Sequence, residues 1–135
     1  MKRNLLVISL LISILFLGCK KHSTNNNSSE ADLAVTTNPP NGSFQAASLG
    51  PFNLTVTITS TMPPNGVKIE VSARKDDGSG DAPFFSISIN STNSVNNFTI
   101  TNTPTGVQCI VEIKVTSLTK SSNQWTGSYH YSRKS

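Results

Sequence analysis

From residue 33 onward, apolar and polar residues alternate along most of the chain. Such alternation is typical of a β-strand with one buried face, because successive side chains of a strand point to opposite sides. Seven runs show it, and no segment between them has a convincing helical period. They predict strands at residues 33–35, 52–59, 67–74, 85–90, 98–100, 107–115 and 125–132.

Turn-forming residues separate these runs. Pro-Pro-Asn-Gly occurs at residues 39–42 and again at 63–66, and Pro104-Thr105-Gly106 precedes the sixth run. Asn-Gly supplies the positive φ angles that tight turns need. Seven short strands joined by turns predict an all-β fold, a single seven-stranded Greek-key sandwich.

The entry into the sixth run carries a resemblance. Residues 103–117 (TPTGVQCIVEIKVTS) place a Pro/Gly turn before a long alternating strand. This resembles strand F of fibronectin type III and related immunoglobulin-like domains, and the resemblance covers residues 33–133. It implies an immunoglobulin-like sandwich.

The first 18 residues have the features of a signal peptide. Lys2 and Arg3 precede an apolar run at 5–17, which is shorter than the roughly 20 residues of a membrane-spanning helix. Phe16-Leu17-Gly18-Cys19 then resembles a bacterial lipobox. The resemblance implies cleavage after residue 18 and a diacylglycerol and further acyl chain on Cys19, because stable anchoring needs two or more chains. An ordinary secretory signal with an incidental cysteine is the alternative.

Residues 19–31 would then form a lipidated tether, followed by one domain at 32–135. The tether is almost free of apolar side chains, which predicts disorder and a reach of about 20 Å. His22 within it is expected to be solvated. The start Gly-Cys-Lys-Lys resembles small lipoproteins of the Bacteroidota. Lys20 and Lys21 replace the acidic residues typical of their surface-exported members, which favours the periplasmic face of the outer membrane over the cell surface.

The net charge and its distribution limit which classes of partner are expected. The whole chain carries +4, but from residue 31 onward seven basic residues oppose six acidic ones, leaving about +1. No clustered basic face of the kind that nucleic-acid binders need is present. Nucleic acid is therefore not an expected partner.

Nothing in the chain predicts catalysis. His130 is the one histidine of the domain, and its parity with Ser128 and Ser132 predicts a solvated outer face. Cys109 alternates with apolar residues, so we expect a buried, inert thiol and no disulfide with Cys19. The protein is therefore not expected to be an enzyme or to hold a cofactor.

A pair of carboxylates is one further candidate for acid–base chemistry. Glu70 and Glu112 are predicted to point outward from neighbouring strands, on the same face as Lys68, Arg74 and Lys114. Cross-strand ion pairs are the favoured interpretation. A polar sheet face is also not expected to supply the cleft that such chemistry needs.

The loop at residues 76–81 is the best metal candidate. Asp77, Ser79 and Asp81 match the first alternating oxygen ligands of a calcium loop. Ala82 and Ser88 stand where that motif has Gly and a bidentate Glu. A plain hairpin loop beginning at Asp76 is favoured, with weak calcium binding as the alternative.

Trp125 could serve as a sugar-binding platform if its ring faced outward. It shares its parity with Tyr129 and Tyr131, and Gly127 between them would make room for a large neighbour. Core packing is therefore the favoured interpretation.

These observations predict a lipid-anchored envelope protein with a non-catalytic module for protein–protein interaction. The expected partners are the membrane, through the lipid on Cys19, and an envelope protein. A surface-displayed carbohydrate-binding accessory protein is the alternative.

Overall fold

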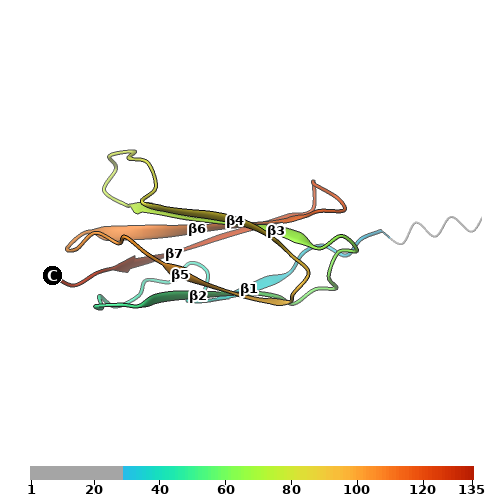
Figure 1. Ribbon diagram of the computed structural model, residues 1–135, viewed down its shortest axis with the longest axis horizontal. Coiled ribbons are helices and arrows are strands. Elements are labelled where there is room, and N and C mark those ends of the chain that lie inside the picture. Colours follow the sequence, from blue (N-terminus) through green and yellow to red (C-terminus); the bar gives the residue numbers. More distant parts are fainter. Residues whose placement is uncertain (1–28) are drawn as a thin grey trace, which may run out of the picture.

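The chain folds as two β-sheets packed face to face. The computed structural model describes residues 29–135 (Figure 1). Its strands are β1 (Val35–Asn38), β2 (Phe52–Ile58), β3 (Val67–Lys75), β4 (Phe85–Ser91), β5 (Val95–Ile100), β6 (Gln108–Ser117) and β7 (Gln124–Ser132). One sheet has the order β1-β2-β5 and the other β4-β3-β6-β7, and all these neighbours are antiparallel. The predicted all-β sandwich is confirmed, and it is compatible with an immunoglobulin-like domain.

Several sequence predictions lie outside the described residues. These are the signal peptide at 1–18, the lipidation of Cys19 and the tether as far as residue 28. Within residues 29–135, no helix is long and apolar enough to cross a membrane.

The core lies between the two sheets. Its members are the inward side chains that alternation predicts, among them Leu54, Val56, Ile69, Val71, Val111, Ile113, Tyr129 and Tyr131. Cys109 is wholly buried among them with a free thiol, which confirms its predicted place in the core. Burial raises the pKa of this thiol, so the nucleophilic thiolate is disfavoured.

The first strand starts later than predicted. Leu33 is buried but precedes β1, which begins at Val35 and continues to Asn38. The Leu33 N–H donates to Asn123 Oδ1 at 2.9 Å, and the Asn123 amide also donates to Glu30 Oε1 and to the Ala31 carbonyl. The buried Asn123 side chain therefore holds residues 30–33, which precede β1, against the turn between β6 and β7.

The fifth strand starts at Val95, three residues before the predicted position. Alternation of apolar residues did not reveal the first three residues of this strand, because the apolar Val95 is exposed whereas the polar Asn96 is buried. The Asn96 side chain is satisfied there by Ser91 Oγ at 2.6 Å and by the Asn93 carbonyl at 2.9 Å. A hydrogen-bonded polar residue thus occupies a core position.

Strand β4 departs from its predicted burial. Phe85 and Ile89 are only partly buried, and Ile87 between them is 38% exposed. The facing sheet has three strands against four, so β4 extends beyond the cover that the other layer provides.

The opposite edge of the four-stranded sheet is covered. Residues 42–48 run alongside β7, where the Gly42 N–H donates to the Ser128 carbonyl at 2.7 Å and the Gln45 N–H to the His130 carbonyl at 2.8 Å. The His130 N–H donates back to the Ser43 carbonyl at 2.8 Å. We refer to residues 42–48 as the edge segment; its sequence shows no alternation, and it was not predicted.

Candidate functional site

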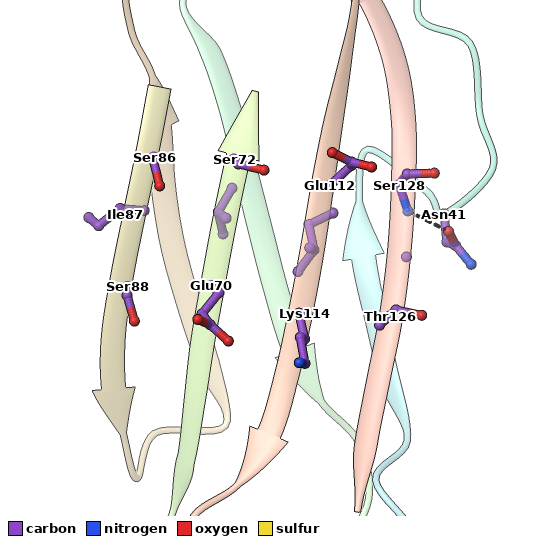
Figure 2. Close-up of a pocket in the computed structure, with 13 residues that line it drawn as sticks. Asn41, Glu70, Ser72, Ser86, Ile87, Ser88, Glu112, Lys114, Thr126 and Ser128 are labelled. Atoms are coloured by element: carbon purple, nitrogen blue, oxygen red, sulfur yellow. Dashed lines mark hydrogen bonds between the residues drawn. The ribbon is translucent and has the colours of Figure 1, made fainter. Parts of the chain in front are cut away.

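The outer face of the four-stranded sheet carries an open groove of about 720 Å³, which we call the outer-face groove. Two rows of polar side chains cross it (Figure 2). The first row is Ser88, Glu70, Lys114 and Thr126, and the second is Ser86, Ser72, Glu112 and Ser128. The expectation that this face has no concavity is therefore wrong.

The acidic side chains of the groove are partly neutralised. Arg74 Nε lies 3.2 Å from Glu112 Oε2 across β3 and β6, as the sequence predicts. Glu70 pairs instead with Lys68 of its own strand, at 2.9 Å. Lys114 lies opposite Glu70 in register but is in no ion pair within the described part of the chain. All these groups are substantially exposed, so each pair contributes at most about 1 kcal/mol to stability.

Asn41 closes one side of the groove. Asn41 lies beside β7, on the side away from β6 (Figure 2). Its side-chain oxygen accepts a hydrogen bond from the Ser128 N–H at 2.9 Å. The same oxygen would lie 2.9 Å from a Cβ on Gly127, and the Trp125 indole would also lie within 2.9 Å of that Cβ. Any side chain at position 127 would therefore clash with Trp125 and Asn41, so glycine makes room for a large neighbour, as predicted.

Trp125 faces the core and not the groove. It is partly buried and packs against the hydrophobic cluster that contains Tyr129 and Tyr131. This placement agrees with the favoured interpretation of Trp125 and removes the main support for its use as an outward sugar platform.

An exposed aromatic ring lies one row beyond the groove. Phe44 of the edge segment is 73% exposed, and its ring stacks on His130 with centroids 4.2 Å apart and an interplanar angle of 4°. His130 is two residues from Ser128 on the same face of β7. One face of the Phe44 ring is therefore supported by the imidazole, while most of the ring meets solvent.

His130 is more enclosed than the sequence predicts. It does lie on the outer face, but Phe44 covers it and its side chain is only 20% exposed. Nε2 lies 3.2 Å from Asp76 Oδ2, and Nδ1 is buried without a hydrogen-bond partner. Among residues 29–135 no hydroxyl or thiol is hydrogen-bonded to this imidazole, so the His–Asp pair lacks the nucleophile of a triad.

The carboxylates of the 76–81 loop point to different partners. Asp76 pairs with His130, and Asp81 Oδ2 lies 3.2 Å from Lys75 Nζ. Asp77 accepts a hydrogen bond from the Ser79 N–H at 3.0 Å, and its hydrogen bonds with Ser79 lower its pKa. No group of three or more His, Cys, Asp or Glu side chains in the described range could hold a metal ion.

Comparisons with known proteins give no relative from which a role could be transferred. No protein family, no curated protein and no solved structure matches the chain.

Sequence reasoning missed two contributors to this surface, Asn41 and Phe44. Asn41 precedes the edge segment and Phe44 belongs to it, and this part of the chain reaches the site through its long-range pairing with β7. An isolated Phe between Ser43 and Gln45 gives no sequence signal that distinguishes an exposed anchor from a core residue.

Proposed function

We propose that the protein is a lipid-anchored cell-envelope protein whose β-sandwich binds a protein partner through the outer face of the four-stranded sheet. The observation that carries the binding part is the outer-face groove with the exposed Phe44 ring beside it. The anchoring part rests on the lipobox-like Phe16-Leu17-Gly18-Cys19. The sandwich then acts as a non-catalytic recognition module at the membrane surface.

The chemistry of this surface suits a protein ligand. Protein interfaces combine a buried aromatic anchor with a polar rim, and a few such anchors carry most of the binding energy. Phe44 supplies the anchor because its ring is already held by His130, so little conformational freedom is lost on binding. Covering a Phe side chain contributes about 1.5–3 kcal/mol.

Lys114 supplies the polar counterpart. Its side chain lies between Glu70 and Thr126 and is in no ion pair with residues 29–135, whereas Glu70 and Glu112 are each paired. A carboxylate of the partner would therefore find a free cation there. We expect the partner to present an apolar side chain to Phe44 and an acidic group to Lys114.

Site-specific photocrosslinking in cells tests this proposal. A photoreactive residue at Thr126, which is exposed in the groove, should capture a discrete protein. The same residue at Asn97, which is exposed on β5 of the opposite sheet, should not. Phe44→Ala in the Thr126 background should lower the crosslink yield at least tenfold. Equal products from both positions would contradict the proposed binding face.

Anchoring is tested separately by metabolic labelling with an alkyne-bearing fatty acid. The full chain should incorporate label, Cys19→Ser should not, and Cys109→Ala should be labelled as well as the parent. Cys109 is the matched control because it is the buried cysteine of the core. Protease treatment of intact cells then distinguishes the periplasmic face, which we expect, from the cell surface.

Carbohydrate binding is the second candidate. The hydroxyls and carboxylates of the groove, with the flat Phe44 ring at its end, are groups that sugars also recognise. A glycan array would favour this alternative if binding were lost in Phe44→Ala and retained in Lys114→Ala.

A further inference from the structure

Strand β4 forms the one long edge of the four-stranded sheet that no described segment covers. The other edge, β7, is paired with the edge segment. Exposed edges usually carry charges, proline or a bulge that block pairing with another chain. Residues 85–91 (FSISINS) contain no charged residue and no proline, and pair with β3 in continuous register.

The hydrogen-bond pattern shows which backbone groups of β4 are free. The Leu118 N–H donates to the Gly66 carbonyl and the Asp76 N–H to the Gln108 carbonyl. These two pairs continue the β3–β6 register by one residue at each end, so the even-numbered residues of β3 direct their backbone groups to β6. The odd-numbered ones are left for β4, where they pair with Phe85, Ile87, Ile89 and Ser91.

The N–H and C=O groups of Ser86, Ser88 and Asn90 therefore point away from the sheet. These are the groups that a further antiparallel strand would bind. Polar side chains accompany them on the outer face, while the side chains of Ile87 and Ile89 belong to the inner face.

We propose that β4 pairs antiparallel with β4 of a second copy of this chain, centred on Ser88. In that register Ser88 meets its own counterpart and Ser86 meets Asn90, and each of these pairs exchanges two backbone hydrogen bonds. Ile87 then lies opposite Ile89 of the other copy at non-hydrogen-bonded positions, where side chains approach most closely. Apolar residues meet apolar residues, polar meet polar, and no like charges are brought together.

The exposure of Ile87 also favours a second copy of the chain as the pairing partner of β4. Its side chain is 38% exposed, and in Figure 2 it extends past β4 on the side away from β3. Pairing would cover it with the Ile89 of the second copy. Edge strand β5 lacks this feature, because its inner side chains Asn96, Phe98 and Ile100 are already buried. Edge strand β1 has only four residues and is followed directly by Pro39.

The pairing would form one continuous sheet from two copies. A two-fold axis perpendicular to the sheet keeps both outer-face grooves on the same side of it. The inference goes beyond the proposed function, because it depends neither on the lipid nor on the ligand of the groove.

Cysteine crosslinking of the full-length chain tests the register. Directly opposed residues of a hydrogen-bonded pair have Cα atoms about 5.5 Å apart, within disulfide range. A Ser88→Cys chain should therefore oxidise to a dimer joined through Cys at position 88. Ser72→Cys, on β3 of the same face, is the matched control, since its two copies would be three strand spacings apart across the sheet and offset by four residues along the strands, roughly 20 Å in all.

We expect at least tenfold more dimer from Ser88→Cys than from Ser72→Cys, with the junction identified by mass spectrometry. Adding Ile87→Lys, which places a charge on the partly exposed edge, should reduce the Ser88→Cys dimer at least tenfold while the circular dichroism spectrum is unchanged. The proposal is overturned if Ser88→Cys stays monomeric with a maleimide-reactive thiol. It is equally overturned by a crosslink to a different protein, by equal dimer from Ser72→Cys, or by insensitivity to Ile87→Lys.

Discussion

Gly127→Ala tests how the core and the groove are coupled through β7. A Cβ at this position would lie 2.9 Å from Trp125 Cζ2, closer still to Cη2, and 2.9 Å from Asn41 Oδ1. Real Cβ atoms rarely come this near to other groups, so the indole or the Asn41 side chain must move. Neither can move freely, because Trp125 packs against the core and Asn41 accepts the Ser128 N–H.

The expected cost has two parts. Overpacking against the indole costs about 1–3 kcal/mol. Loss of the Asn41–Ser128 hydrogen bond adds about 0.5–1.5 kcal/mol. A total of about 1.5–4.5 kcal/mol should lower the melting temperature of residues 29–135 by roughly 6 °C or more, given about 4–8 °C per kcal/mol for a domain of this size.

Urea and thermal unfolding followed by fluorescence measure this directly, because the chain contains a single tryptophan. Thr126→Ala, at an exposed position next to Gly127, is the matched control and should change stability by less than 0.5 kcal/mol. A Gly127→Ala protein with unchanged melting temperature and unchanged emission would refute the argument that the indole fills the space over Gly127.

Three further outcomes are expected. Burial raises the pKa of Tyr131 to about 12 and that of Tyr129 further, so the unfolded chain loses these protons first. The contribution of the two tyrosines to stability should therefore be complete below about pH 10 and decline as pH rises toward 12, with tyrosinate absorbance at 295 nm appearing together with unfolding. Ionisation of either tyrosine in the folded protein would contradict this. The Cys109 thiol should react with a disulfide reagent at least a hundredfold more slowly in the folded than in the urea-unfolded domain, and a rapid native reaction would contradict its burial. Calorimetry with millimolar calcium should show no heat of binding that depends on Asp77 and Asp81, because their carboxylates are directed to Ser79 and Lys75. A heat of binding that Asp77→Asn abolishes would show that the loop does bind calcium.

The strands could be predicted from the sequence because alternation and burial have the same physical cause. Every run from Phe52 to Tyr131 whose apolar residues lie two apart forms a strand, and the inward parity of Tyr129 is as expected. The prediction was wrong about burial at Ile87, since parity gives the direction of a side chain but not whether the facing sheet extends far enough to cover it.

The candidate site was predicted less completely. Parity placed Glu112 and Arg74 on one face and so predicted cross-strand ion pairing there, which the Arg74–Glu112 pair confirms, but it did not predict that Glu70 pairs with Lys68 of its own strand. The contacts of His130 with Phe44 and Asp76 join residues far apart in the chain through the edge segment and a loop, and neither has a periodic pattern. Local sequence therefore placed His130 on the correct face but not in its enclosed surroundings.

The central claim is that the outer face of the four-stranded sheet binds a protein at the membrane. Photocrosslinking from Thr126 in the lipid-anchored chain, with Asn97 as the control position, tests it most directly. The account predicts one discrete protein adduct from Thr126 that Phe44→Ala weakens at least tenfold, and none from Asn97. Adducts of equal yield from the two positions, or a Thr126 adduct indifferent to Phe44→Ala, would contradict it.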